Sequence, residues 1–268
     1  MLAMDGQFQC HGCPAVKEDA MDRAIYTVMA GARQTMDAQA VHANNLANVS
    51  TTGFRKDFVD ASSRYLTSDG AQGSRVTTTT VANETDFSAG ALQETGRELD
   101  VAIEGKGFIA VIAKDGSEAY TRAGELHVNT LGQLITRAGL PVLGNGGPIS
   151  IPPAEKIEIG SDGGISVRAL GQSADTLSTV DRIKLVGGNE EVGMTKRADG
   201  LFESKSGDLL APDPTVSVVS GNLEASNVNA VEAMTEVLAL SRHFELQLKI
   251  LSTVETNTES ATRLLSTS

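Results

Sequence analysis

The 268-residue sequence has no tryptophan, and aromatic residues make up only 4% of it. This scarcity disfavours a core built on large aromatic side chains, and it equally disfavours a carbohydrate platform of stacked rings. The longest unbroken apolar run, residues 108–113, is far shorter than the roughly 20 residues that a membrane-spanning helix needs. We therefore expect no membrane insertion, and small and β-branched side chains must provide most of the packing.

Positive charge is also scarce, since 22 Lys and Arg face 34 Asp and Glu and leave a formal net charge of −12. Such a surface repels phosphate backbones, so nucleic acid is not an expected partner. Only four histidines are present, and none lies at metal-ligand spacing from another. We predict no catalytic residue, no cofactor and no metal site. The alternative from a different class is a secreted enzyme or adhesin with a β domain.

The two cysteines, Cys10 and Cys13, form a C-x-x-C pair near the start of the chain. The pair has neither a second pair that would complete a zinc site nor the strand-to-helix context of a redox motif. Residues 1–20 also lack the basic and apolar regions of a secretory signal. A helical pattern begins at Met21. We hypothesise that translation starts there and that residues 1–20 are a non-native or disordered extension.

Two segments at opposite ends of the sequence have helical periodicity, with apolar residues at steps of three and four. The first segment, residues 21–52, carries a stripe of Ile25, Met29, Ala32, Met36, Ala40, Ala43 and Ala47. The second, residues 222–268, carries a seam of Val237, Leu240, Phe244, Gln247, Leu251, Val254, Thr258, Ala261 and Leu265. Ser226 or Asn227 is positioned to cap the second helix. A helix over residues 231–265 would be about 50 Å long, too long for a small domain to cover, so the stripes indicate assembly.

Between the helices, residues 53–98 are predicted to form an extended linker region and residues 99–221 a β domain. In the latter the hydrophobic period is two, and short strands separated by turn signals are predicted. They are residues 99–103, 107–113, 118–122, 125–130, 133–137, 148–151, 156–159, 164–168, 182–186 and 215–219. These signals are Asp115-Gly116, Leu131-Gly132 and the Asp-Gly-Gly sequence at residues 162–164. No crossover helix is evident, so the sheet should be antiparallel. The predicted fold class is α+β, with long N- and C-terminal helices forming a coiled-coil-like layer and a central antiparallel β domain.

Four stretches resemble the flagellar rod and hook protein family. The longest is ANNLANVSTTGF at residues 43–54, which resembles the signature of that family. LDVAI with GKGF at residues 99–108 and AYTRAG at residues 119–124 resemble its β domain, and SGNLEASNVN at residues 220–229 resembles the segment before its last helix. Within the family the chain looks most like the proximal-rod members, and a distal-rod or hook-type subunit is the alternative. Residues 1–20 depart from the resemblance.

The resemblance implies a structural subunit of the flagellar basal body, located in the periplasmic rod, that transmits torque for motility. It implies export through the flagellar type III apparatus without a cleaved signal peptide. The implied partners are further copies of the chain, other subunits of the inner and distal rod, and the export apparatus itself.

The residues that we predict to form the assembly interface come from the two helical stripes and from the signature. They are Ile25, Met29, Met36, Asn45, Leu46, Asn48, Val237, Leu240, Phe244, Leu251, Val254 and Leu265.

Overall fold

The computed structural model describes residues 18–65, 76–169, 171, 177–188 and 193–266. The chain divides into two compact units. The helical unit comprises the described residues of 18–41, 59–83 and 235–266, and the β unit comprises those of 42–58 and 84–234. The β unit therefore takes in more of the chain than the predicted domain at residues 99–221. The C-x-x-C pair of Cys10 and Cys13 lies outside the described residues.

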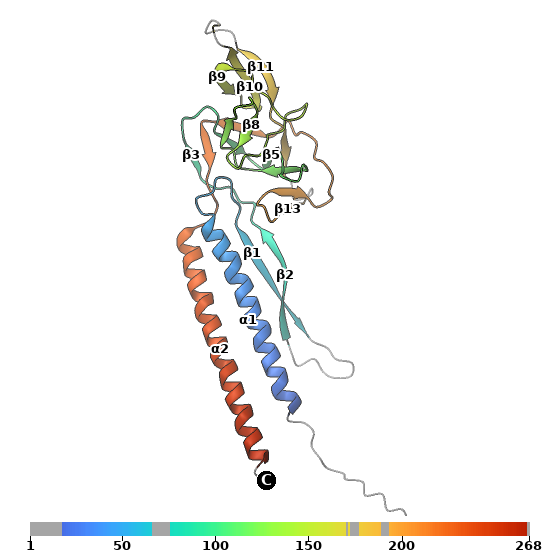
Figure 1. Ribbon diagram of the computed structural model, residues 1–268, viewed down its shortest axis with the longest axis vertical. Helices are drawn as coiled ribbons and strands as arrows, with labels where there is room; N and C mark the ends of the chain where they lie inside the picture. Colours follow the sequence, from blue (N-terminus) through green and yellow to red (C-terminus); the bar gives the residue numbers. More distant parts are fainter. Residues whose placement is uncertain (1–17, 66–75, 170, 172–176, 189–192, 267–268) are drawn as a thin grey trace, which may run out of the picture. The chain divides into compact units, whose positions relative to one another are not determined.

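The element order is helix, strands, helix, as Figure 1 shows. The helices are α1 (Glu18–Ala47) and α2 (Ala230–Ser266). The strands are β1 (Asp57–Tyr65), β2 (Val76–Thr85), β3 (Leu92–Glu94), β4 (Val101–Glu104), β5 (Gly107–Ile112), β6 (Glu118–Thr121), β7 (Leu126–Val128), β8 (Leu134–Thr136), β9 (Ala154–Ile159), β10 (Gly164–Ala169), β11 (Ser178–Arg182), β12 (Leu185–Gly187), β13 (Met194–Lys196), β14 (Phe202–Ser204), β15 (Ser217–Ser220) and β16 (Asn222–Glu224).

Small antiparallel sheets make up the β unit. Its largest sheet has the order β12-β5-β6-β14-β13, and a three-stranded sheet has the order β11-β10-β9. The pairs β15-β4, β16-β3 and β7-β8 complete it, and β1 pairs with β2. The prediction of two terminal helices that pack together, with an antiparallel β region between them in the sequence, is confirmed.

Each of the three predicted turns joins two antiparallel strands. Asp115-Gly116 lies between β5 and β6, Leu131-Gly132 between β7 and β8, and residues 162–164 between β9 and β10. In each turn a glycine has a positive φ, a conformation that a side chain disfavours. The glycine turns therefore determine which strands that are neighbours in the sequence pair with each other.

Aliphatic side chains fill the main core of the β unit, as the low aromatic content requires. Val101, Ile109, Leu126 and Leu134 are all fully buried within it. A second, smaller cluster contains the aromatic residues Phe108, Tyr120 and Phe202, and in it the rings of Phe108 and Phe202 lie 5.1 Å apart, tilted at 51°. The core thus consists of an aliphatic part and a small aromatic part.

Parts of the predicted strand pattern were wrong. Residues 148–151 form only isolated bridges, because the backbone there contacts two different loops. The strands β11, β13, β14 and β16 were missed, since three of them are only three residues long and too short for a period to show. The segment predicted as an extended linker contains β1, β2 and β3.

The predicted cap of the second helix was also wrong. Asn229 Oδ1 accepts hydrogen bonds from the backbone N–H groups of Val231 at 3.1 Å and Glu232 at 3.4 Å. The side chain of Asn227 binds elsewhere, to the strand region of the β unit. The helix consequently begins at Ala230 and its 37 residues extend for about 55 Å. Neither helix, over its described residues, is long and apolar enough to cross a membrane.

Two leucines of one β-hairpin provide a test of the core. Leu126 is fully buried, whereas Leu131 in the turn is 79% exposed. We expect Leu126→Ala to lower the free energy of unfolding by about 2–5 kcal/mol, because it leaves a cavity. Leu131→Ala should change it by less than about 0.5 kcal/mol. Urea denaturation of the purified protein followed by circular dichroism measures both, and equal effects would contradict the assigned core.

Candidate functional site

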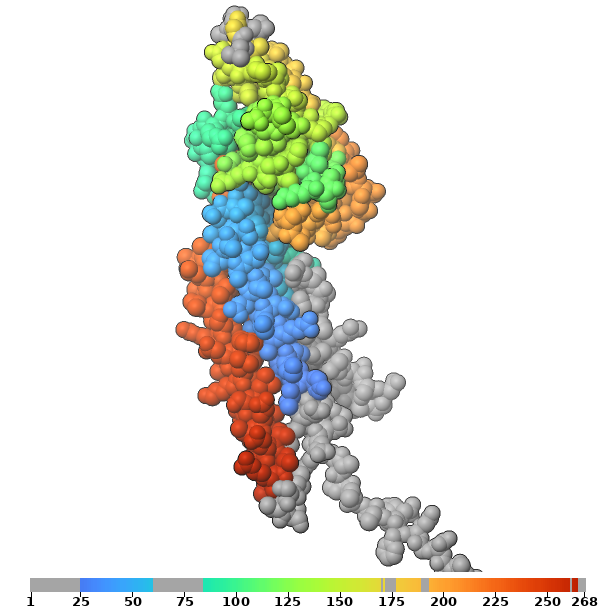
Figure 2. Space-filling view, viewed as in Figure 1, coloured from blue at the N-terminus to red at the C-terminus, as the bar shows by residue number. Residues whose placement is uncertain are grey.

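The two terminal helices pack against each other in an antiparallel arrangement. The Thr35 hydroxyl donates a hydrogen bond to Gln247 Oε1 at 3.3 Å, and Gln39 Nε2 donates one to the Ser241 hydroxyl at 3.1 Å. Gly31 leaves room for the Gln247 amide, which would lie 3.3 Å from an added Cβ. Figure 2 shows the helices side by side. Polar contacts therefore pin the register of this pair.

The predicted seam of α2 faces α1. Its residues from position 237 to position 258 are half-buried, whereas their neighbours on α2 are mostly exposed. These half-buried residues are Val237, Leu240, Phe244, Gln247, Leu251, Val254 and Thr258. The side chain of Leu265 lies outside those described. The α2 seam thus has a partner within its own chain.

The stripe predicted on α1 is divided between two faces. Ala32 is buried and Ile25 half-buried, but Met29 and Met36 are 54% and 55% exposed. The contacts with α2 come instead from the neighbouring positions Gly31, Thr35 and Gln39. The apolar stripe predicted on α1 therefore includes residues that are packed within the chain and residues that stay exposed to solvent.

The signature residues at the end of α1 have contacts within the chain. Asn45 is 4% exposed, its amide N–H donates to the Asp57 carbonyl at 2.7 Å, and its Oδ1 accepts from the Asp57 N–H at 2.9 Å. Asn48 donates to the Asn44 carbonyl and accepts from the Thr51 hydroxyl. Leu46 is half-buried. Contact of these three residues with another subunit stays a prediction.

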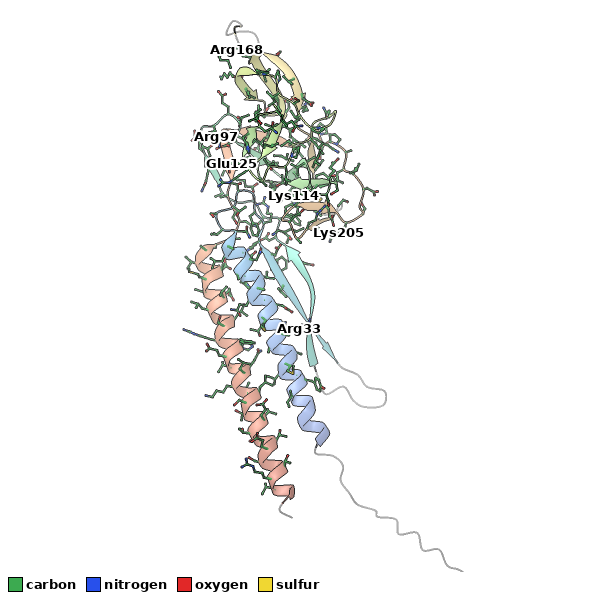
Figure 3. All side chains as sticks on the ribbon, viewed as in Figure 1. Arg33, Arg97, Lys114, Glu125, Arg168 and Lys205 are labelled. Atoms are coloured by element: carbon green, nitrogen blue, oxygen red, sulfur yellow. The ribbon has the colours of Figure 1, made fainter. Side chains whose placement is uncertain are left out.

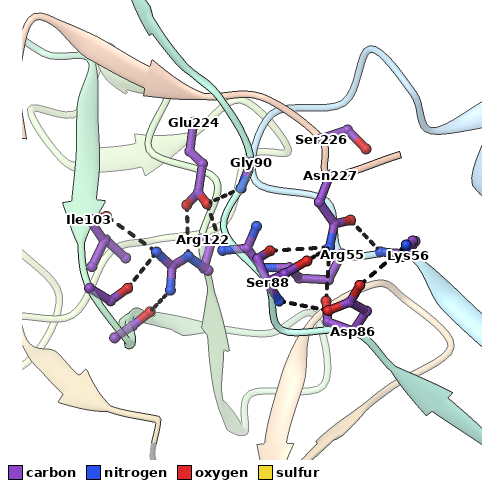
Figure 4. A network of polar contacts seen from close by, with 12 residues as sticks. Arg55, Lys56, Asp86, Ser88, Gly90, Ile103, Arg122, Glu224, Ser226 and Asn227 are labelled. Carbon is purple, nitrogen blue, oxygen red and sulfur yellow. Dashed lines mark hydrogen bonds and ion pairs between the residues drawn. The ribbon is translucent and has the colours of Figure 1, made fainter. Parts of the chain in front are cut away.

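A buried carboxylate holds together the segments that follow α1 and precede α2. Glu224 Oε1 accepts from Arg55 Nη2 at 2.6 Å and from the Gly90 N–H at 2.9 Å, while Oε2 accepts from Arg122 Nε at 2.8 Å. The three charged side chains are at most 4% exposed. Figure 4 shows this cluster, which we call the Glu224 hub. Four distant segments of the sequence are joined there.

Arg122 also donates to three backbone carbonyls. Nη1 donates to Gly107 at 3.0 Å, and Nη2 donates to Ile103 at 3.2 Å and to Gly105 at 2.9 Å. The guanidinium carbon lies 5.7 Å from the centre of the Phe108 ring. Arg122 thus fixes the turn between β4 and β5.

Burial by itself raises the pKa of Glu224, but the charges of Arg122 and Arg55 and their hydrogen bonds outweigh this effect. The net result is a pKa below the ordinary value of a glutamate. The carboxylate is therefore ionised in the folded protein, as two neighbouring guanidinium groups require.

A second set of polar contacts surrounds the hub. Asn227 Oδ1 accepts from the Lys56 N–H at 2.7 Å, and its amide donates to the carbonyls of Asp86 and Ser88. The Lys196 ammonium donates to the Asp57 carboxylate at 2.8 Å and to the Arg55 carbonyl. These contacts tie β13 to the segment that follows α1.

The surroundings of Gly53 explain why the signature has a glycine at this position. Its φ is +68°, and an added Cβ would lie 2.4 Å from the Arg122 carbonyl carbon. Its N–H donates to the Glu224 carbonyl at 2.8 Å. Only glycine allows this close approach of two backbones beside the hub.

The hub residues Arg55, Arg122 and Glu224 were missed as a site by sequence reasoning. The last two lie within stretches on which the resemblance rests, and Arg55 directly follows the longest one. Charged residues within or beside these stretches were the signal in the sequence that could have indicated the site. Their pairing could not be read from the sequence, since 169 residues separate Arg55 from Glu224. Over the described part of the chain, no group of three acidic, histidine or cysteine side chains is placed to hold a metal ion.

Three family profiles match successive parts of the chain. Residues 25–55 match the profile described as "Flagella basal body rod protein", which covers α1 and the signature. Residues 102–167 match "Flagellar hook protein FlgE/F/G D1 domain", and residues 219–264 match "Flagellar basal body rod FlgEFG protein C-terminal". Both helices and much of the β unit are thereby covered.

Curated relatives match over almost the whole chain. The chain is 43% identical to "Flagellar basal-body rod protein FlgF" of Salmonella typhimurium over 257 residues, with 92% of the chain and 100% of the relative covered. It is 43% identical to the FlgF protein of Escherichia coli with the same coverage. The "Flagellar basal-body rod protein FlgG" of Bacillus subtilis is 33% identical, with 87% of the chain and 95% of the relative covered.

Removal of the hub carboxylate should destabilise the β unit. Glu224→Gln keeps the side-chain shape but leaves two buried guanidinium groups without a counter-charge, so we expect a loss of about 3–5 kcal/mol in the free energy of unfolding. The matched control is Glu158→Gln, which removes an exposed ion pair with Lys156 and should cost at most about 1 kcal/mol. Urea denaturation at neutral pH compares the two. Similar small losses would show that the hub does not hold the fold.

The effect of Glu224→Gln on the free energy of unfolding should also depend on pH. Because folding lowers the pKa of Glu224, its contribution to stability is fully present above the unfolded pKa of about 4.3 and is lost as the pH falls through the folded pKa. The stability difference between the native protein and Glu224→Gln should therefore narrow as the pH is lowered below about 4. Denaturation midpoints across pH 3–7 measure this difference. A gap of constant size down to pH 3 would contradict the assignment.

Proposed function

The chain belongs to the family of flagellar basal-body rod proteins, and from this premise we propose that it is a proximal-rod subunit that polymerises through its terminal helices to transmit torque. Membership of a family of structural rod proteins makes its role structural and not enzymatic. It also implies assembly with other rod subunits.

The observation that carries the proposed mode of assembly is the exposed apolar surface of the two helices. Tyr26, Met29 and Met36 of α1 and Leu238 and Leu246 of α2 are each more than half exposed. Large apolar residues in such number on paired helices are typical of surfaces that bind other protein chains. A rod requires contacts of this kind, because every subunit must bind neighbours on different faces.

The interface that we propose keeps the residues predicted from the sequence. Met29 and Met36 supply open apolar surface on α1. The α2 seam, which is only half-buried against α1, supplies a second surface on which a neighbouring helix packs at the groove between the pair. Residues 99–221, which are acidic and rich in turns, form the outward-facing domain.

Partners and location follow as part of the same proposal. The chain reaches the periplasmic part of the rod through the flagellar type III export apparatus, and there it binds inner-rod neighbours on one side and distal-rod subunits on the other. The full-length similarity to FlgF of two species supports this placement. A distal-rod or hook-type position is the second candidate, favoured by the 33% identity to a FlgG protein.

The test uses a strain that lacks the native gene. The wild-type chain should restore motility and complete basal bodies. Leu251→Asp should not restore them, because the charge would lie in the helix pair, where burial without a partner is costly. Leu131→Asp, at an exposed turn of the β unit, is the control and should be motile. Swimming assays and electron microscopy of basal bodies provide the measurement, and a motile Leu251→Asp strain would refute assembly through the helices.

A further inference from the structure

The open face of α1 has heptad spacing. Tyr26, Met29, Arg33, Met36 and Ala40 follow at steps of three, four, three and four, and all five are exposed. At about 100° per residue they lie about 140° around the helix from the face that contacts α2. Figure 3 labels Arg33 on this helix. A single cation thus occupies the middle of an otherwise uncharged stripe, which we call the outer α1 stripe.

A matching stripe runs along α2 beside its seam. Leu238, Ser241, Glu245, Leu248 and Ser252 follow at steps of three, four, three and four. Of these, Ser241 is half-buried and accepts the hydrogen bond from Gln39 within the chain. Leu238 is 61% and Leu248 47% exposed, and Glu245 and Ser252 are also exposed. A single anion occupies the middle of this second stripe, which we call the outer α2 stripe.

The direction of packing between neighbours follows from the fold and from the symmetry of a filament. Within one chain, Thr35 pairs with Gln247 and Gln39 with Ser241, so α1 and α2 are antiparallel. Subunits related by a screw operation along a filament all point the same way. The α1 helix of one copy is therefore antiparallel to the α2 helix of the next.

The two outer stripes match in that direction with nearly the same register as the pair within the chain. When Arg33 is placed opposite Glu245, Ala40 falls opposite Leu238. Met29 falls opposite Lys249, one residue from Leu248, and Met36 falls opposite Arg242, one residue from Ser241. Tyr26 then falls opposite Ser252. A large residue meets a small one at both ends, and the opposite charges meet in the middle. Helix pairs gain close packing and register from this complementarity.

We propose that the outer α1 stripe of one copy binds the outer α2 stripe of a second copy, with Arg33 paired to Glu245 across the contact. This inference rests on the proposed function, since it names the partner of the helical surface in the rod. Among the described residues, the side chains of Arg33 and Glu245 form no ion pair or hydrogen bond, and both are exposed. Both charges are consequently available to a neighbour.

Charge exchange tests the pairing in the gene-deletion strain. Arg33→Glu alone and Glu245→Arg alone each place like charges together, so each should reduce the number of complete basal bodies per cell by about tenfold or more. The double variant restores opposite charges and should return the count to near the wild-type value. Lys114→Glu, at an exposed lysine of the β unit, is the control and should have no effect.

A cross-linking experiment reports the contact directly. Arg33→Cys and Glu245→Cys are placed in two separately tagged copies in which Cys10 and Cys13 are changed to Ser. The two copies are expressed together, so that any disulfide between the tags joins the introduced cysteines of different subunits. Basal bodies should contain this mixed dimer. Replacing Glu245→Cys by Ser260→Cys, about four turns further along α2, should abolish it.

The outcomes separate the pairing from the proposed function. If the wild-type chain fails to restore motility, the rod assignment fails. If wild type restores it but both single charge variants are fully motile, or the double variant stays defective and the mixed dimer is missing, the pairing is overturned while the rod assignment holds. A mixed disulfide to a different rod protein in place of the second copy would also overturn it. Circular dichroism of each purified variant confirms that a defect does not come from misfolding.

Discussion

One buried carboxylate fixes the geometry on which the β unit depends. Glu224 is the last residue of β16, the strand directly before α2, and it binds Arg55, which follows α1, and Arg122, which follows β6. Backbone carbonyls accept the remaining donors of Arg122. Nε and Nη1 of Arg55 are buried and have no hydrogen-bond partner among the described residues, so the carboxylate of Glu224 is the main partner of that guanidinium group. The exit of the first helical segment and the entry to the last are thereby held beside the same strands.

The helical pair follows a different principle from the β unit. Its internal contact is small and partly polar, with hydrogen bonds at Thr35 and Gln39 and a glycine at position 31. Apolar side chains as large as Met36 and Leu238 remain exposed. Such a pair gains register from its polar contacts and leaves several large apolar side chains exposed. This division suits a subunit whose helices complete their packing only in a polymer.

Similarity to the rod relatives covers the same elements that perform these two tasks. The profile over residues 25–55 includes α1, the signature and Arg55, and the profile over residues 219–264 includes Glu224 and most of α2. The signature glycine at position 53 and Asn45 have structural reasons in contacts within the chain. The motif that identifies the family therefore also forms the end of α1 and the turn that leads to the Glu224 hub.

The sequence by itself determined the local features: two long helices, short antiparallel strands and three glycine turns. Periodicity and positive-φ glycines act over a few residues and need no knowledge of distant contacts. It also indicated the family, through four stretches. Only the tertiary structure decided that Arg55 and Arg122 share Glu224, that Asn229 caps α2, and that Met29 and Met36 lie off the face contacting α2. Each of these depends on which distant segments meet, and an apolar or charged residue has the same letter whether its partner lies in its own chain or in a neighbour.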